Sequence, residues 1–253
     1  MTTTSREKPV HAPMDQFQSA GRELLIGGVP LERLVDRVGQ TPFYAYDRAL
    51  LTRRVAELRA ALPAGIKLHY AMKANPMPAL VGHMARLVDG IDVASGGELR
   101  VALDSGADPH EISFAGPGKR HAELRQAVAA GILINIESFR EVELLARLSA
   151  EMALPARVAV RVNPDFELRG AGMRMGGGAQ VFGVDLEQVP TLLARIAQTD
   201  PALASRLIRQ AIAFAQDRGQ RLGTTVRFAM TTNGTVLDDD GLDLLRQHFS
   251  HVA

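Results

Sequence analysis

LHYAMKANP, residues 68–76, carries the strongest signal for the fold of this chain. The apolar and aromatic run that ends at Met72 predicts a buried strand, because side chains of this kind suit a pleated, packed surface. Lys73 follows at once, and Asn75 with Pro76 breaks the strand. We therefore expect Lys73 where a strand ends and a loop begins, which is where β/α barrels place functional side chains.

Helices are expected on both sides of this strand. Before it, apolar residues recur at spacings of three and four and form one stripe: Leu51, Val55, Leu58 and Leu62. Asp47 can cap the first turn of this helix, and Pro63 stops it. After the strand, PALVGHMARLVDG predicts a helix over residues 78–90 that Gly90 closes.

The order of strand and then helix recurs along the chain. Four more apolar segments are expected as strands: IDVAS (91–95), ISFAGPG (112–118), ILINIES (132–138) and RVAVRVNP (157–164). Ser95 with Glu98, and Ser138 with Glu141, have the spacing of a capping box at a helix start. Five such strands predict a parallel sheet covered by helices, either doubly wound or a β/α barrel. The barrel is favoured, because MKANP stands where a dinucleotide-binding sheet would carry its Gly-rich turn.

Composition excludes several classes of protein. The chain is 46% hydrophobic and 23% charged, with a net charge of +1 and no basic block, so no nucleic-acid partner is expected. The absence of cysteine excludes disulfides, thiolate zinc sites and iron–sulfur clusters. No apolar run reaches the roughly 18 residues that span a membrane, so we expect a soluble cytoplasmic protein without membrane contact. The polar residues 1–22 are expected to form a mobile arm.

Five motifs, YAMKANP, DVASGGEL, FAGPGK, INIES and RVNP, occur in this order. The set closely resembles the fold-type III pyridoxal-phosphate-dependent decarboxylases, which include the diaminopimelate and ornithine decarboxylases. The resemblance covers about residues 23–197 and is nearest the exosortase-associated branch. It implies an α/β fold, an incomplete (β/α) TIM-type barrel of the alanine racemase-like kind. It also implies pyridoxal 5'-phosphate as cofactor and a small amino acid as substrate.

The resemblance assigns a Schiff base with the cofactor to Lys73, and it places Asp92 and Arg161 near the cofactor. A lysine that leaves an apolar strand loses hydration, which lowers its pKa and favours the nucleophilic amine. Structural alternatives stand beside these roles. Lys73 could extend from the strand end to water, Asp92 could hydrogen-bond a neighbouring loop, and Arg161 could pair with a barrel carboxylate.

Two other features are expected to be structural. Gly176 to Gly178 resemble a phosphate cradle, but they do not open a helix, so we expect a loop there. The histidines lack metal-ligand spacing, so no metal site is expected.

Beyond about Ala197 the family pattern stops. The ring-stacking histidine, the phosphate-binding glycines, the acidic partner of the pyridine nitrogen and the interface cysteine expected by resemblance are absent. Within 201–253, residues 226–249 resemble a radical S-adenosylmethionine barrel fragment, but without cysteines its radical chemistry is excluded. We expect a barrel portion over 23–198, with about five family strands, and a divergent tail over 199–253 that adds one β/α unit.

The function expected by resemblance is that of an amino-acid decarboxylase like diaminopimelate decarboxylase, truncated or chimeric, with impaired turnover. By family the chain would be a carboxy-lyase, but its missing segments leave open whether it is an enzyme. The alternatives are a non-catalytic barrel that binds pyridoxal phosphate and a nonfunctional fusion product. An incomplete barrel exposes an edge strand, which favours oligomers such as a homodimer.

Overall fold

A computed structural model describes residues 16–63, 65–163, 181–199, 229–230 and 251–252. The chain divides into two compact units, residues 1–57 and residues 58–253, and each is described by itself. The boundary falls within α2 (Arg48–Ala61), the helix predicted before the first barrel strand. Asp47 begins it as expected, since its Oδ1 accepts a hydrogen bond from the Ala49 backbone at 2.8 Å.

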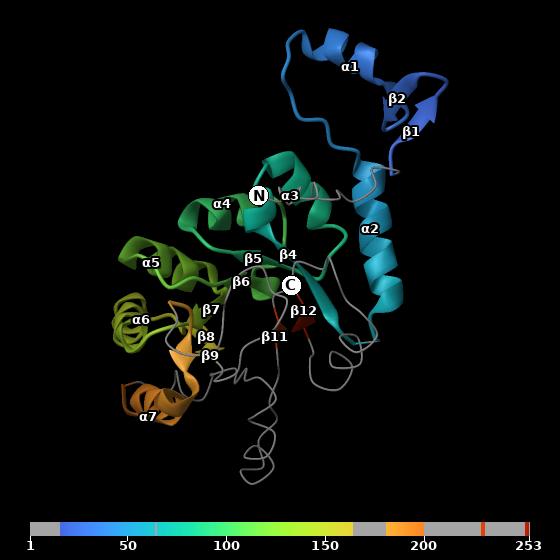
Figure 1. The fold of residues 1–253 in the computed structure, drawn as a ribbon. Coiled ribbons are helices and arrows are strands. Elements are labelled where there is room, and N and C mark those ends of the chain that lie inside the picture. The colour runs from blue at the N-terminus through green and yellow to red at the C-terminus, as the bar shows by residue number, and fades with distance from the viewer. Residues whose placement is uncertain (1–15, 64, 164–180, 200–228, 231–250, 253) are drawn as a thin grey trace, which may run out of the picture. The chain divides into compact units, whose positions relative to one another are not determined.

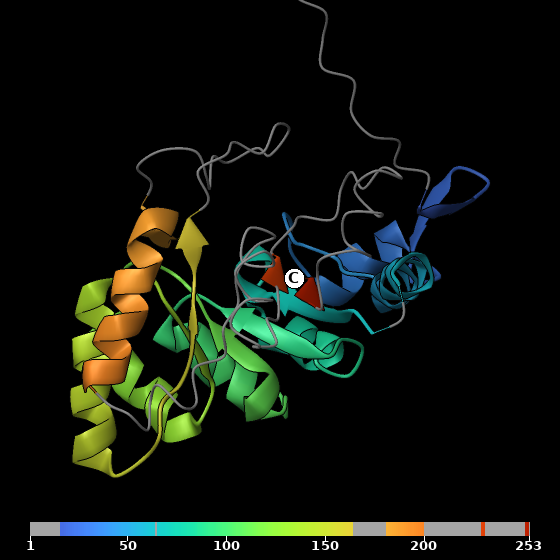
Figure 2. The same cartoon turned by 90° about the horizontal axis from the view of Figure 1, so that it is seen from below.

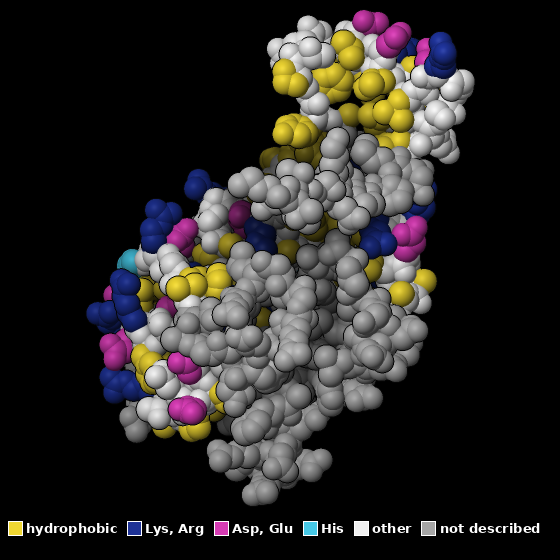
Figure 3. All heavy atoms as spheres, in the orientation of Figure 1, with side chains coloured by type: hydrophobic (Ala, Val, Ile, Leu, Met, Phe, Trp, Pro, Cys, Tyr) yellow, Lys and Arg dark blue, Asp and Glu magenta, His cyan; other side chains and the backbone are white. Residues whose placement is uncertain are grey.

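The first unit contains a small antiparallel sheet and a helix. Its strands β1 (Gln18–Ala20), β2 (Glu23–Ile26) and β3 (Val29–Pro30) pair in chain order, and α1 (Leu31–Val38) follows. Regular structure thus begins before residue 23, because β1 pairs with β2. Figure 3 shows hydrophobic side chains on the surface of this unit, and the exposed ones are Leu24, Leu31, Val38, Tyr44 and Tyr46.

The second unit is built on the five parallel strands that the sequence predicts, which hydrogen-bond in chain order (Figure 1). They are β4 (Lys67–Ala71), β5 (Gly90–Val93), β6 (Ile112–Phe114), β7 (Leu133–Ile136) and β8 (Arg157–Val160). On the free side of β4, β12 (His251–Val252) pairs in parallel, and β11 (Ala229–Met230) pairs with β12. The result is a seven-stranded sheet of an incomplete β/α barrel.

Helices follow the strands and cover one side of the sheet (Figure 2). They are α3 (Pro78–Met84), α4 (Gly96–Asp104), α5 (His121–Ala130), α6 (Phe139–Met152) and α7 (Val189–Thr199). Short elements complete the described chain: η1 (Met72–Ala74), η2 (Pro109–Glu111), η3 (Leu186–Gln188), and the parallel pair β9 (Val162–Asn163) and β10 (Val184–Asp185). No helix in these described ranges is long and apolar enough to cross a membrane.

The helix expected over residues 78–90 is too long. It ends at Met84, and Gly90 is the first residue of β5 rather than a helix terminator. The reason is tertiary, because a Cβ on Gly90 would lie 2.3 Å from the Glu111 carbonyl oxygen and 2.6 Å from His69 Cε1. A glycine here lets the neighbouring strand and the imidazole approach closely.

Ser95 and Ser138 both begin their helices as predicted. The glutamate of each motif differs from that of a capping box in the backbone group that it binds. Ser95 Oγ accepts from the Glu98 backbone at 3.2 Å, and Ser138 Oγ accepts from that of Glu141 at 3.4 Å. Each glutamate, however, accepts at 2.7 Å from the residue before its serine, Ala94 or Glu137. The carboxylates therefore tie each helix start to the end of the preceding strand.

Alternation along the strands separates an apolar face from a polar face. Side chains on the helix-covered face are almost fully buried and include Ile91, Val93, Ile112, Phe114, Ile134 and Ile136. The intervening positions carry polar groups, His69, Asp92, Ser113 and Asn135. Since successive side chains point to opposite faces of a sheet, these four share the face away from the helices.

Candidate functional site

Lys73 lies just beyond the end of β4, in the single turn η1. Met72 beside it is fully buried, and Tyr70 Oη donates to the Asn75 carbonyl at 2.9 Å, so the turn is held on both sides. The Lys73 side chain is exposed, whereas we expected the strand to strip it of water. The difference arises because the strand stops at Ala71 and the lysine projects from the following turn.

Asp92 lies on the neighbouring strand β5, in register with Ala71, two residues before Lys73. Its Oδ1 is 3.1 Å from Nδ1 of His69, and the two side chains are 20% and 9% exposed. The partner found for Asp92 is thus a histidine on the adjacent strand rather than the loop that we considered as an alternative. Gly90 provides the space in which the imidazole lies.

Ser113 and Asn135 extend this polar face across the next two strands. Ser113 is in register with Asp92, and Asn135 Nδ2 lies 3.3 Å from Ser113 Oγ and 3.4 Å from the Phe114 carbonyl oxygen. A row of hydrogen-bonding groups therefore runs from β4 to β7 on the face away from the helices. Such a row suits a polar ligand placed against the sheet.

Arg161 follows β8, at the far end of the five family strands from Lys73. Its Nη1 donates to Glu137 Oε1 at 3.2 Å, and its guanidinium lies 4.9 Å from the centre of the Phe182 ring. The Arg161 side chain is 27% exposed and that of Glu137 is fully buried. The pairing with a barrel carboxylate is therefore present, and a role of Arg161 in holding cofactor stays a prediction.

The loop after β6 is fixed by a buried ion pair. Lys119 Nζ donates to the Gly116 carbonyl at 2.6 Å and to Glu141 Oε1 at 2.8 Å, and the side chains of the pair are 1% and 6% exposed. Burial raises the pKa of Glu141, although the ammonium of Lys119 opposes that rise. The FAGPGK motif thus holds its loop by charge as well as by its glycines.

A second carboxylate, Glu123, ties α5 to the preceding loop. It accepts from the Gly96 backbone at 2.8 Å and from the backbone of Arg120 at 2.9 Å. The hydrogen bond from the Arg120 side chain lowers the pKa of Glu123 to about 2, with help from these two backbone groups against desolvation. This carboxylate is ionised at neutral pH and serves to hold two helix starts together.

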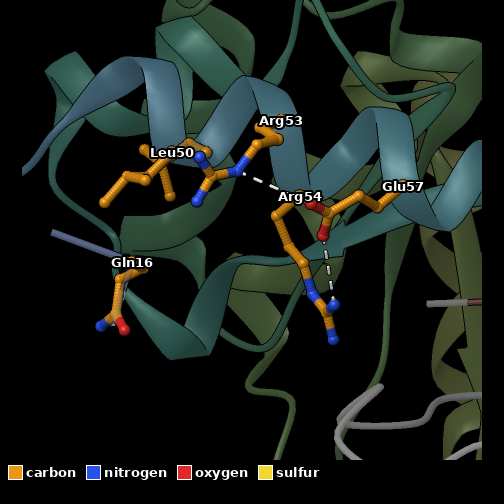
Figure 4. Close-up of a pocket in the computed structure, with 6 residues that line it drawn as sticks. Gln16, Leu50, Arg53, Arg54 and Glu57 are labelled. Atoms are coloured by element: carbon orange, nitrogen blue, oxygen red, sulfur yellow. Dashed lines mark hydrogen bonds and ion pairs between the residues drawn. The ribbon is translucent and has the colours of Figure 1, made fainter. Parts of the chain in front are cut away.

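The pocket in Figure 4 belongs to the first unit. Its volume is about 350 Å³, and it is lined by Gln16, Leu50, Leu51, Arg53, Arg54 and Glu57. Both arginines are exposed and lie within 3.6 Å of Glu57, so their charges are partly neutralised. None of the predicted site residues lines it.

The sequence predicts Lys73, Asp92 and Arg161 as site residues, but it does not reveal the side chains that pair with Asp92 and Arg161. His69 is expected only as a surface or core histidine, Glu137 occurs in a motif without an assigned role, and Ser113 and Asn135 are not singled out. The available signal for His69, Ser113 and Asn135 was a single polar residue flanked on both sides by apolar or aromatic residues within a strand. The run Gly176 to Gly178 lies outside the described residues. Within the described ranges, no group of three histidine, aspartate or glutamate residues is arranged to hold a metal ion.

The donor set fits a small ligand that carries an aldehyde and polar groups. An exposed amine stands at the carboxyl edge of a parallel sheet, a carboxylate with a fixed partner lies on the adjacent strand β5, and a guanidinium with a fixed partner follows β8. An amine is the group that captures an aldehyde, and the other side chains supply polar contacts. Fold and site together define a β/α-barrel protein equipped to bind a carbonyl cofactor.

The comparison with protein families names the class. The family described as "Pyridoxal-dependent decarboxylase, pyridoxal binding domain" matches residues 48–203, more than half of the chain. The chain therefore belongs to the pyridoxal-dependent decarboxylase family, and the match includes the pyridoxal 5'-phosphate binding domain. Residues 226–249, for which we expected a radical S-adenosylmethionine barrel fragment, lie beyond this match and, apart from Ala229–Met230, outside the described residues.

Curated relatives point to diaminopimelate decarboxylases. The enzyme of Pseudomonas aeruginosa is 35% identical over 192 residues, which are 74% of this chain and 46% of that protein. That of Aquifex aeolicus is 38% identical over 168 residues, 66% of this chain and 40% of the relative. The chain thus spans about half the length of the curated relatives that it matches.

Solved structures confirm the fold. AQ1208 from Aquifex aeolicus superimposes with a TM-score of 0.74 at 25% identity, covering 94% of this chain and 63% of that one. Diaminopimelate decarboxylase from Helicobacter pylori, solved in complex with L-lysine, gives a TM-score of 0.72 at 21% identity over 87% of this chain and 64% of that one.

Proposed function

We propose that this chain is the pyridoxal-phosphate-binding part of an amino-acid decarboxylase that resembles diaminopimelate decarboxylase. The observation that carries the proposal is the position of Lys73, an exposed amine at the carboxyl end of β4 beside the strand that bears Asp92. Barrel enzymes assemble their sites at this edge. The family match and the diaminopimelate decarboxylases among the relatives support the reaction class.

Each residue has a distinct task in this proposal. Lys73 would hold the cofactor covalently through its amine. Asp92, oriented by His69, would present a carboxylate from β5, and Arg161, oriented by Glu137, would present a positive charge from the end of β8. When bound, pyridoxal phosphate supplies a conjugated ring that accepts the electrons left when carbon dioxide departs.

Reduction with borohydride tests the attachment. The protein is incubated with pyridoxal phosphate, treated with borohydride, digested and analysed by mass spectrometry. We expect a phosphopyridoxyl group on Lys73 and none in the Lys73→Arg variant. Lys67 and Lys119 are internal controls, because Glu111 and Glu141 already bind their ammonium groups. A label that avoids Lys73, or that spreads evenly over the lysines, contradicts the proposal.

The relatives support a proposal for the substrate class, and turnover is a separate measurement. We propose an amino acid with a second amino group, since the curated relatives include diaminopimelate decarboxylases and a Helicobacter pylori relative was crystallised with L-lysine. Carbon dioxide release is measured with diaminopimelate, lysine, ornithine and arginine, with Lys73→Ala as the control. Release that the control abolishes supports a decarboxylase. Modification of Lys73 without any release supports the alternative of a cofactor-binding barrel without catalysis.

Three finer expectations stay proposals. They are the exosortase-associated branch, a cytoplasmic location and a homodimer. Light scattering on the purified protein measures the oligomer directly, and a mass of one chain at all concentrations contradicts the homodimer.

A further inference from the structure

Glu137 is a fully buried carboxylate at the junction of three loops. Its Oε1 accepts from the Gly116 backbone at 2.5 Å and from Arg161 Nη1 at 3.2 Å. Its Oε2 accepts from the Gly183 backbone at 3.2 Å and lies 3.4 Å from Arg161 Nη1. Both oxygens are thus committed, and a buried charge needs partners of this kind.

The strand order explains how the Glu137 side chain reaches both Gly116 and Arg161. Glu137 follows β7, which lies between β6 and β8 in the sheet. Gly116 follows β6 and Arg161 follows β8, so the carboxylate sits between the ends of its two neighbours. Side chains at the ends of adjacent parallel strands meet at one edge of the sheet.

Arg161 is held from several directions at once. Its backbone donates to the Ile136 carbonyl and accepts from Val184, both at 2.9 Å. Gly183, with φ of +76°, passes so close that a Cβ there would lie 2.9 Å from the Arg161 carbonyl oxygen. With the backbone fixed, the carboxylate of Glu137 and the ring of Phe182 both contact the guanidinium and help to hold it in place.

Glu137 differs from two other buried carboxylates, Glu123 and Glu141, in the charged residue that it binds. Glu123 and Glu141 also accept backbone N–H groups at the carboxyl edge of the sheet. Their charged partners are Arg120 and Lys119, which are not predicted site residues. Of the three, Glu137 is the one that binds a residue predicted to contact the cofactor.

We infer that Glu137 is a positioning residue that orients Arg161 toward bound pyridoxal phosphate. The inference rests on the proposed function, because it assumes that Arg161 faces the cofactor. Glutamine at position 137 keeps the shape and one carbonyl oxygen but removes the charge that holds the guanidinium. Losing such a supporting group weakens binding at a site by about 10- to 100-fold where it has been measured at metal centres.

The test measures the pyridoxal phosphate Kd by absorbance titration for four variants, Glu137→Gln, Arg161→Gln, their combination and Glu123→Gln. We expect Glu137→Gln to raise Kd at least about tenfold and Glu123→Gln to change it less than about twofold. If Glu137 acts through Arg161, the combined variant binds no more weakly than Arg161→Gln, because coupled residues are non-additive. Glu137→Asp, which retains the charge, should recover part of the affinity.

Circular dichroism melting first sets a temperature at which all variants are folded. A Kd for Glu137→Gln within about twofold of the parent protein overturns the inference, and so does full additivity in the combined variant. If the parent protein itself gains no label on Lys73, the proposed function fails. If the parent is labelled and Glu137→Gln binds equally well, only the positioning role fails.

Discussion

Nδ1 of His69 and Oδ1 of Asp92 are 3.1 Å apart, joining neighbouring strands on the face of the sheet that is turned away from the helices. Their positions are 23 residues apart in the chain, and Ala71 and Asp92 are partners in the register of β4 and β5. The sheet is otherwise packed with Ile, Val and Phe, so a polar pair here departs from the rule of an apolar core. Such departures are expected at functional sites.

Removing the imidazole tests this pair. We expect His69→Phe to lower the free energy of unfolding by about 1–3 kcal/mol, because Asp92 loses a hydrogen-bond partner while still largely buried. Asp92→Asn in the His69→Phe background should cost less than Asp92→Asn alone. Urea unfolding of the double-mutant cycle measures the coupling, expected at about 0.5–3 kcal/mol. Simple additivity would show that the two side chains do not interact.

Gly90 is expected to be intolerant of any side chain. The Cβ of Gly90→Ala would meet the Glu111 carbonyl and the His69 ring at under 3 Å, so the strands must separate. We expect a loss of about 1–3 kcal/mol in unfolding free energy, the usual cost of overpacking. Gly82→Ala is the matched control, because it lies inside α3 with nothing within 4 Å of the new methyl group. That variant should gain up to about 1 kcal/mol. Equal stability of the two variants contradicts the prediction.

Glu123 should make stability depend on pH in the acid range. The folded-state pKa of about 2 lies below the usual value of 4.5, so the ionised carboxylate stabilises the fold above pH 4.5. This contribution is lost as pH falls through about 2, because protonation removes it. After allowance for the exposure of Arg120, we expect Glu123→Gln to cost about 1–2 kcal/mol at pH 7.

The difference between the parent protein and Glu123→Gln should shrink steadily below pH 4.5 when urea unfolding is repeated across the acid range. Glu57→Gln is the control, since its pairs with Arg53 and Arg54 are exposed and should contribute under about 1 kcal/mol. A difference that is constant with pH would mean that ionisation of Glu123 does not matter.

The buried pair of Lys119 and Glu141 should be sensitive to removal of one partner. Lys119→Met leaves a carboxyl group that is 6% exposed without its cation, and we expect a loss of about 3–5 kcal/mol. Because burial already raises the pKa of Glu141, this variant should become relatively more stable as pH falls and the carboxyl group takes up a proton.

Adding Glu141→Gln to Lys119→Met should restore part of the loss, since no buried charge then remains. Arg125→Ala, which breaks an exposed pair with Glu151, should cost less than about 1 kcal/mol. Thermal or urea unfolding measures all of these variants. If Lys119→Met is no less stable than Arg125→Ala, the ion pair of Lys119 with Glu141 contributes no more to the stability of the fold than an exposed pair does.

The five barrel strands and the helix starts could be predicted because their signals are local. The run LHYAM before Lys73 and the serines at 95 and 138 determine structure within a few residues of themselves. The predicted end of the helix at Gly90 was wrong for the opposite reason. That glycine is required by the close approach of Glu111 in η2 and His69 in β4, and the local sequence pattern carries no trace of that approach.

The sequence alone thus predicts the order of the five barrel strands with the helices beside them, the place of Lys73 at a strand end and the family motifs. The tertiary structure alone decided that His69 binds Asp92 and that Glu137 gathers Arg161 with two loop glycines. The physical reason is register. Periodicity and capping act between near neighbours in the chain, whereas these partners stand between 21 and 46 residues apart and meet only when parallel strands lie side by side.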